Sequence, residues 1–228
     1  MNEFRHQNLS LHFVGVTGHR DLDDADRPGL DKAVHACMDD IEAHHSKSKY
    51  CLLSGFAAGA DQLVAQCALH RGWALHAVFA ASSDSYEATM PDTEAHILDI
   101  SIKSFSSTMS EKDANKLLND LLPRCDEVTI VTPNSIDGET GYAAVASALV
   151  DSVESLIALW DGAPSRGAGG TAYTLTKYLE TTPKKFGQLD SERAAYWVRT
   201  RRLGEKLHCS EPAWEKFRLS DLSIQTGR

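Results

Sequence analysis

The sequence lacks the features that mark membrane-spanning, disulfide-bonded and zinc-binding proteins. Among its 228 residues, no apolar stretch approaches the roughly 20 residues that a membrane-spanning helix needs. The N-terminal MNEFRHQNLS does not have the apolar core of a secretory signal. The five cysteines are odd in number and include no C-x-x-C pair, so neither a disulfide framework nor a zinc knuckle is expected. We expect a cytoplasmic chain with reduced thiols, no metal site and no contact with a membrane.

Basic residues are scarce over most of the chain. Residues 1–183 contain 13 Lys and Arg against 26 Asp and Glu, whereas residues 184–228 contain 10 against 6. Non-specific binding of nucleic acid requires many cations that neutralise phosphates, so the acidic body argues against a nucleic-acid partner. Only the C-terminal segment can hold a polyanion, and its arginines can instead dock on the acidic body.

Short apolar runs alternate with segments of helical spacing along the first 183 residues. This alternation, with nearly continuous apolar strands, is typical of a doubly wound, mainly parallel sheet of five or more strands that has helices on both faces. Strands are predicted at 11–16, 51–53, 73–80, 127–132 and 155–160, and helices at 29–45, 60–68, 143–153 and 171–179.

The pattern weakens after Pro183. The segment around 190–207 is basic and favours a helix over a further strand. We therefore predict an α/β ligand-binding domain over residues 1–183 and a basic helical C-terminal appendage over residues 184–228.

A glycine-rich loop follows the fifth predicted strand. Gly167, Gly169 and Gly170 stand directly before the helix that begins near Thr171. Glycines let a backbone approach a ligand closely, and a helix N-terminus offers N–H groups and a positive dipole end. The loop therefore predicts a phosphate seat, in which the hydroxyl of Thr171 either contacts the phosphate or caps the helix.

A second loop of small residues follows the second predicted strand, with the sequence SGFAAGAD at 54–61. Its small residues suit either close packing of a helix on the sheet or close approach of a ligand. Neither loop matches G-x-x-x-x-G-K-[ST], so a P-loop nucleotidase is disfavoured.

Polar residues also follow the first predicted strand. Arg20 can clamp a phosphate through two hydrogen bonds, and His19 can donate to a phosphate or ribose oxygen. In the alternative interpretation, Arg20 anchors its loop by pairing with Asp21 or Asp23. Because the carboxyl ends of parallel strands share one edge of the sheet, we expect all these loops to form a single site.

Two aromatic residues are candidates for stacking on a base. Trp160 ends a buried strand, which favours a place in the core, so Tyr86 is the better candidate.

Four segments together resemble a known superfamily: VGVTGHRDL (14–22), LLSGFAAGADQLVAQCAL (52–69), the segment around Tyr86, and LIALWDGAPSRGAGGTAYTL (156–175). They are similar to the SLOG superfamily, whose members include lonely-guy phosphoribohydrolases and DNA-processing proteins. The resemblance spans about residues 11–180. It implies a Rossmann-like fold that binds a nucleotide or nucleotide-derived ligand, a homodimer or larger oligomer, and a role in bacterial defence or signalling.

The enzymes of this superfamily carry G-G-x-G-T-x-x-E, and the position of that glutamate corresponds to Thr174 here. A hydroxyl does not replace an acid–base carboxylate without a loss of about 10²–10⁴-fold, so we predict ligand binding without catalysis. The alternative is a nucleoside-5′-monophosphate phosphoribohydrolase with a relocated carboxylate, for which Asp161 and Glu139 are the candidates, followed by Asp61.

The sequence therefore predicts a ligand site that needs no cofactor. Its candidate residues are Thr17, Gly18, His19, Arg20, Ser54, Gly55, Gly59, Asp61, Tyr86, Asp161, Gly167, Gly169, Gly170 and Thr171.

Overall fold

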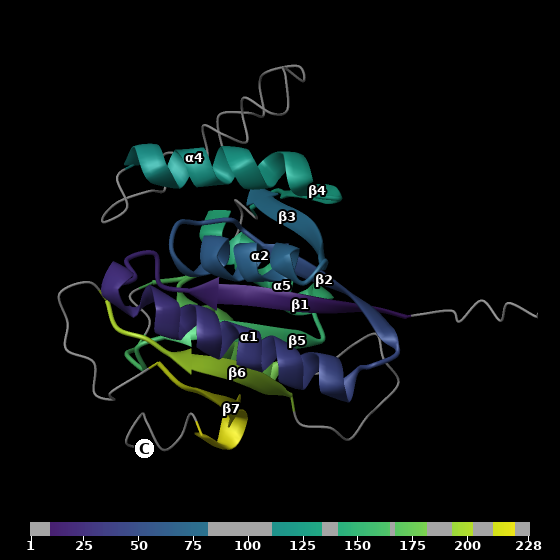
Figure 1. Cartoon of the computed structure of the whole chain (residues 1–228), viewed down its shortest axis with the longest axis vertical. Helices are drawn as coiled ribbons and strands as arrows, with labels where there is room; N and C mark the ends of the chain where they lie inside the picture. Colours follow the sequence, from purple (N-terminus) through teal and green to yellow (C-terminus); the bar gives the residue numbers. More distant parts are fainter. Residues whose placement is uncertain are drawn as a thin grey trace, which may run out of the picture.

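The computed structural model describes residues 10–81, 111–133, 141–164, 167–181, 193–202 and 212–221. One seven-stranded sheet in the order β4-β3-β2-β1-β5-β6-β7 passes through them (Figure 1). The first six strands are parallel, and β7 is antiparallel to β6. The strands are β1 (Ser10–Gly18), β2 (Ser48–Ser54), β3 (Ala74–Ala80), β4 (Glu127–Val131), β5 (Ser155–Trp160), β6 (Ala194–Arg199) and β7 (Trp214–Arg218).

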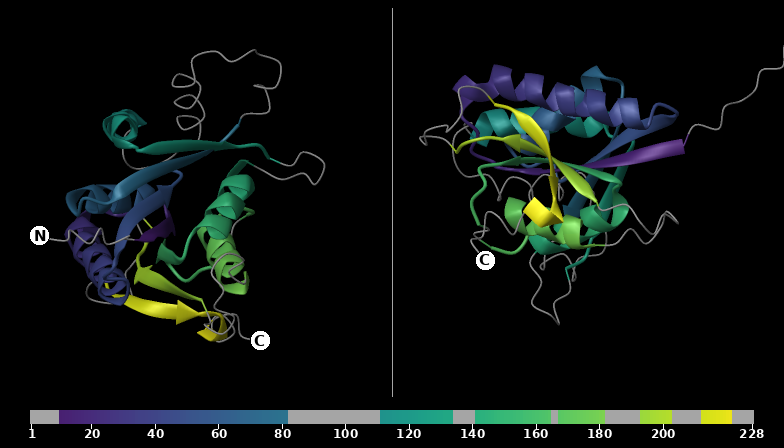
Figure 2. Two further views of the ribbon diagram at one scale, coloured as in Figure 1. Left: turned by 90° about the vertical axis from the view of Figure 1, so that its right-hand side faces the viewer. Right: turned by 90° about the horizontal axis from the view of Figure 1, so that it is seen from below.

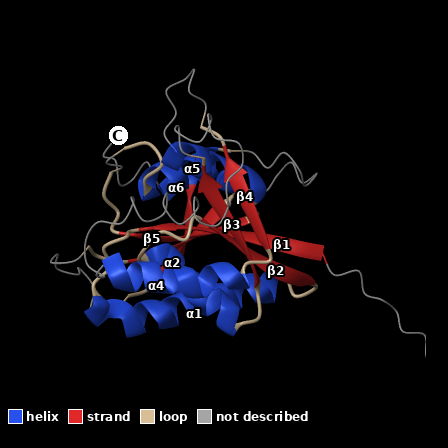
Figure 3. Ribbon diagram, turned by 90° about the horizontal axis from the view of Figure 1, so that it is seen from above, coloured by secondary structure: helices blue, strands red, loops and turns tan. Residues whose placement is uncertain are grey.

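Helices cover both faces of the sheet (Figure 3). In that view α1, α2 and α4 lie on one side of the strands, and α5 and α6 lie on the other; Figure 2 shows the same layers from two further directions. This arrangement confirms the predicted α/β, Rossmann-like doubly wound fold. The helices are α1 (Arg27–His44), α2 (Ala60–His70), α4 (Glu111–Leu121), α5 (Gly141–Ser152) and α6 (Thr171–Glu180).

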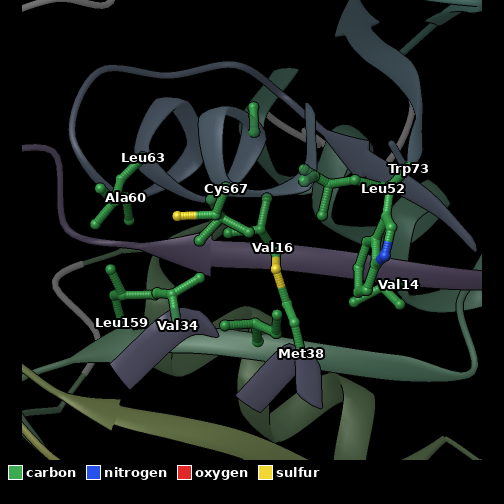
Figure 4. Close-up of a cluster of buried hydrophobic side chains, with 14 of the residues drawn as sticks. Val14, Val16, Val34, Met38, Leu52, Ala60, Leu63, Cys67, Trp73 and Leu159 are labelled. Atoms are coloured by element: carbon green, nitrogen blue, oxygen red, sulfur yellow. The ribbon is translucent and has the colours of Figure 1, made fainter. Parts of the chain in front are cut away.

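The hydrophobic core lies in two layers because side chains alternate across the sheet. Val14 and Val16 of β1 belong to one buried cluster with Met38 of α1 and Leu63 of α2 (Figure 4). On the other face the core is built around Leu156 and its neighbours under α5 and α6. Within the described ranges, no helix is long and apolar enough to cross a bilayer.

The strand order reverses beside β1. The chain places β2, β3 and β4 successively on one side of β1, then crosses to place β5 on its other side. In open α/β sheets, this switch point is where a crevice forms outside the carboxyl ends of the strands. The fold therefore brings the loops that follow β1 and β5 together.

The predicted C-terminal helix around 190–207 is wrong, because residues 194–199 form β6 inside the sheet. Ala195 and Trp197 join the core under α6, whereas Tyr196 and Val198 join the core under α1. The strand is therefore buried on both faces, as a parallel strand between two neighbours must be. The described parts of 184–228 extend the sheet of residues 1–183.

Candidate functional site

The loop after β1 is held tightly against the start of α2. The His19 N–H donates to the carbonyl of Leu159 at 3.1 Å, and the His19 carbonyl accepts from the Ala60 N–H at 3.0 Å. Gly59 has a φ of +78°, and a Cβ at this residue would lie 2.5 Å from the carbonyl oxygens of both His19 and Arg20. Gly59, which the sequence analysis predicts as a ligand-site residue, permits a close approach between the two backbone segments.

The His19 side chain joins the loops after β1 and β5. Its ring is buried, and Nε2 accepts a hydrogen bond of 3.0 Å from the Asp161 N–H. Burial lowers the pKa of His19 and outweighs the opposing effect of the Asp161 carboxylate. The imidazole is therefore neutral near pH 7, and its Nε2 is occupied by the hydrogen bond from the Asp161 N–H.

Asp161 is an ionised carboxylate that uses both of its oxygens within the protein. Oδ1 accepts from the Ala163 N–H at 2.8 Å and lies 3.1 Å from His19 Nε2, while Oδ2 accepts from Arg202 Nε at 3.0 Å. Burial raises the pKa of Asp161, but the Ala163 hydrogen bond and the cation of Arg202 hold it below its usual value. These contacts give Asp161 a structural role.

Arginines of the C-terminal segment dock on the acidic loop after β1, as the charge distribution suggested. Arg202 lies 3.2 Å from Asp21, and Arg201 lies 3.0 Å from Asp23 and 2.7 Å from Asp26. Asp21 and Asp23, the residues considered as anchors for Arg20, thus have arginine partners from the other end of the chain.

Arg20 lies over an aromatic ring at the start of α5. Its guanidinium carbon is 4.7 Å from the centre of the Tyr142 ring, and its Nη1 donates to the Tyr142 hydroxyl at 3.4 Å. Tyr142 is 48% exposed, so the pair is accessible to solvent. The sequence did not suggest Tyr142, because a tyrosine in a first helical turn belongs to no motif; its place after a loop at the carboxyl edge of the sheet is the only signal.

The glycine loop passes directly beside Tyr142. Gly169 has a φ of +81°, and a Cβ there would lie 2.4 Å from the carbonyl carbon of Tyr142 and 2.7 Å from the Ala143 nitrogen. Only glycine combines this backbone conformation with such close contact. Among the residues that the structure describes, a Cβ at Gly167 would meet nothing within 4 Å, so the loop is closely packed at Gly169 and less so at Gly167.

The first turn of α6 has unsatisfied N–H groups. Gly170 is the N-cap, no side chain caps the helix, and the first helical bond runs from the Thr174 N–H to the Gly170 carbonyl at 2.9 Å. The N–H groups of Thr171, Ala172 and Tyr173 have no acceptor among the described residues. The capping interpretation of Thr171 is therefore wrong, since Thr171 is the first residue inside the helix.

The loop after β2 is organised by Asp61. Asp61 Oδ2 accepts from the Ala57 N–H at 3.3 Å, and Ser54 Oγ accepts from the Phe56 N–H at 2.9 Å. A Cβ at Gly55 would lie 3.4 Å from Asp61 Oδ2. Burial raises the pKa of Asp61 to about 6 despite these hydrogen bonds.

Thr174, which aligns with the glutamate of the motif that the sequence resembles, is buried, and its hydroxyl donates to the Gly170 carbonyl at 3.1 Å. Trp160 is also buried, with Nε1 donating to the Ala163 carbonyl at 2.9 Å, which places it in the core. Thr17 is a buried residue of β1. The candidates Tyr86 and Glu139 lie outside the described residues.

Among the residues that the structure describes, there is no group of three or more His, Cys, Asp or Glu side chains that can hold a metal ion.

Comparison with known proteins finds similarity at the level of solved structures. No family model matches the chain, and no curated protein matches it. The chain is similar to DNA processing protein A from Streptococcus pneumoniae, with 17% identity and a TM-score of 0.41 over 75% of this chain. It is also similar to TM1055, a structural genomics target, with 12% identity and a TM-score of 0.37, over 74% of this chain and 68% of that one.

The fold is the one that the SLOG resemblance implies. This chain covers 47% of DNA processing protein A, or about half its length.

Proposed function

We propose that the carboxyl edge of the sheet binds a nucleotide or nucleotide-derived ligand through its phosphate groups and does not hydrolyse it. The supporting observation is the combination of three unsatisfied N–H groups at the start of α6 with Arg20 on the neighbouring loop. Gly169, two residues before α6, and Arg20, in the loop after β1, both lie against Tyr142. A helix N-terminus attracts anions through its free N–H groups and dipole, and a guanidinium adds a full positive charge.

The glycine loop supports a phosphate seat in this place. Gly169 brings the loop against the start of α5, while a Cβ at Gly167 would meet no described residue within 4 Å. A phosphate that accepts from the N–H groups of Thr171 and Ala172 needs this kind of backbone, in which no side chain covers the helix end. Tyr142 and Arg20 then flank the ligand on the side of β1.

The absence of hydrolysis is supported by the state of two residues. Thr174 cannot supply a carboxylate, and its hydroxyl is already bonded to the Gly170 carbonyl. The Asp161 carboxylate accepts hydrogen bonds from the Ala163 N–H and from Arg202 Nε. A carboxylate engaged in this way is a poor general base, because accepting a proton costs it those charge-assisted contacts.

Isothermal titration calorimetry with mono-, di- and cyclic nucleotides and ADP-ribose tests the proposal. We expect at least one of them to bind, and an Arg20→Ala variant to bind it at least about tenfold more weakly, as the loss of a charge-assisted contact predicts. Absence of binding across the whole panel would reject the function.

A pair of substitutions at Thr171 separates the hydroxyl from the backbone N–H. Thr171→Ala removes the hydroxyl alone, whereas Thr171→Pro also removes the N–H. Proline is favoured at the first helical position, and the ψ of 169° at Gly170 suits a residue that precedes proline. If the N–H groups hold the ligand, Thr171→Pro weakens binding much more than Thr171→Ala does, while the two variants keep similar helix content by circular dichroism.

A hydrolase is the second candidate, and Asp61 is the residue that favours it. Burial raises the pKa of this carboxyl to about 6, which is close to the range useful for a general acid at neutral pH. Incubation with AMP followed by chromatography for free adenine distinguishes the two functions. Release of adenine that disappears in Asp61→Asn would favour the hydrolase; intact AMP favours the binding protein.

A further inference from the structure

We propose that Arg202, in the C-terminal segment after β6, is a positioning residue of the anion site, because it pairs with Asp21, which follows Arg20 in the loop after β1, and with Asp161 in the loop after β5. This inference rests on the proposed function. It assigns a role in ligand binding to a residue that follows the last parallel strand.

Arg202 bridges two loops of the site edge. Its Nε donates to Asp161 Oδ2 at 3.0 Å on the loop after β5, and its Nη1 donates to Asp21 Oδ1 at 3.2 Å on the loop after β1. The three side chains are only 11–23% exposed, so water screens the charges less than it does at an open surface. A β-bridge between Leu22 and Arg202 fixes the backbone of the C-terminal segment at the same point.

Arg202 is connected through Asp161 to His19, the residue that precedes Arg20. Asp161, held by Arg202, lies against His19, and the His19 ring accepts the N–H of Asp161. The His19 backbone is in turn bonded to Leu159 and Ala60. Arg20 follows His19 directly, so the position of its backbone depends on this chain of contacts.

The charge balance gives Arg202 a second effect on the anion site. Without Arg202, Asp21 and Asp161 are two partly buried carboxylates that have lost the cation between them. They repel each other, which loosens the two loops that carry them, and they oppose the approach of an anion. Arg202 therefore lowers the electrostatic cost of binding a ligand phosphate at this edge of the sheet.

The test measures affinity for ADP by calorimetry in three variants of the full chain. We expect Arg202→Gln to bind ADP at least about tenfold more weakly than the wild type, since a single nearby charge commonly changes affinity by this factor. Arg202→Lys keeps the charge but not the forked geometry, so it regains part of the affinity. The double variant Asp21→Asn with Arg202→Gln regains part of it as well, because one released carboxylate is gone.

Arg199→Gln is the matched control. Arg199 precedes Arg202 by three residues and pairs with Glu215 at 2.6 Å on the exposed side of β6 and β7. We expect this variant to bind ADP as the wild type does. An Arg202→Gln protein that is folded and binds ADP with unchanged affinity would overturn the inference, as would a double variant no better than Arg202→Gln.

Amide hydrogen exchange in the unliganded protein provides a measurement that needs no ligand. We expect the N–H groups of His19, Ala60 and Asp161 to exchange faster in Arg202→Gln and to recover in the double variant, with no change at Ala77 of β3. Unchanged exchange at His19 and Asp161 overturns the positioning role. If no nucleotide binds the wild type, the proposed function fails, while the exchange data still decide whether Arg202 positions the loop. If Arg202→Gln does not fold, Arg202→Lys and the double variant carry the same comparison.

Discussion

Gly18 and Ala60 are in such close contact that a Cβ on Gly18 would lie 2.2 Å from the Cβ of Ala60. The contact sets how near α2 begins to the end of β1, and thus the position of the loop that carries His19 and Arg20. The Cβ added to Gly18 would also lie 3.0 Å from the Cβ and the carbonyl oxygen of Leu159. Glycine at residue 18 is therefore required by packing of the strand end.

Substitution of Gly18 by alanine is expected to destabilise the protein. An added methyl group in a closely packed place costs about 1–3 kcal/mol. Because the end of β1 or the start of α2 must move to make room for it, the loop that carries Arg20 moves as well. Urea unfolding followed by circular dichroism measures the loss. Gly167→Ala is the control, because no described residue lies within 4 Å of the added Cβ; its stability should change by less than about 0.5 kcal/mol. Equal stability of the two variants would contradict the packing role.

Gly169→Ala should affect both stability and ligand binding. Its φ of +81° disfavours alanine, and the new Cβ would overlap with the backbone of Tyr142 and Ala143. We expect a loss of about 1–3 kcal/mol in thermal unfolding, together with weaker nucleotide binding, since the loop must move away from α5. A Gly169→Ala protein as stable as Gly167→Ala would show that the loop adapts without cost.

The first turn of α6 gives a prediction about Thr171. Because Gly170 is the N-cap and no side chain caps the helix, removal of the Thr171 hydroxyl should leave the free energy of unfolding within about 0.5 kcal/mol of the wild type. A capping threonine would cost about 1 kcal/mol. Denaturant unfolding of Thr171→Ala distinguishes these values, and a loss near the larger one would restore the capping interpretation.

The sequence predicted those elements whose apolar pattern reports burial directly. SLIALW is apolar apart from Ser155, and it became β5, buried on every residue. The pattern failed for β6 because Arg193 and Arg199 flank its apolar run and suggested a basic helix. The signal was the run AAYWV itself, whose large aromatic residues favour a strand.

Only those features of the candidate site that depend on residues close together in the sequence could be predicted. Glycines before a helix predict an anion seat, and the structure places Gly167, Gly169 and Gly170 directly before α6. Arg20 contacts Tyr142 and Asp161 contacts Arg202, and in each pair the two residues are distant in sequence. No spacing rule relates such residues, since they meet only when the sheet assembles.

Acid should destabilise the protein through His12. Its ring is buried, lies 4.0 Å from the ring of His45, and has Nε2 within 3.0 Å of Ser155 Oγ. Burial, reinforced by His45, lowers the pKa of His12 to about 4. The folded state thus binds fewer protons than the unfolded chain between about pH 6.5 and 4. The stability that the neutral His12 contributes is fully present above pH 6.5 and falls as the pH drops to 4, by about 3 kcal/mol in total.

Asp61 changes stability in the opposite direction over part of this window. Its pKa of about 6 exceeds the unfolded value, so the folded state binds the extra proton and gains stability as the pH falls from about 6 to 4. Urea unfolding at pH 7 and pH 4.5 separates the two groups. His12→Gln should lose less stability on acidification than the wild type, and Asp61→Asn should lose more. Parallel pH profiles for all three proteins would contradict both assignments.

Arg193 is expected to stabilise the protein through the shape of its guanidinium. Nη1 donates to the carbonyl of Val150 at 3.3 Å and to that of Tyr178 at 3.4 Å, while Nη2 donates to the carbonyl of Val153 at 3.3 Å. The guanidinium carbon also lies 4.6 Å from the Tyr178 ring. One side chain at the start of β6 thus satisfies carbonyl groups at the ends of α5 and α6, where cations are favoured.

A lysine cannot reproduce this fork, because its ammonium is a single point of donation. We therefore expect Arg193→Lys to lose about 2 kcal/mol in denaturant unfolding, as the loss of charged hydrogen bonds predicts, and Arg193→Ala to lose at least as much. Arg199→Lys, at the exposed pair with Glu215, should change stability by less than about 0.5 kcal/mol. If Arg193→Lys were as stable as Arg199→Lys, charge alone would account for the contact and the geometry of the fork would be irrelevant.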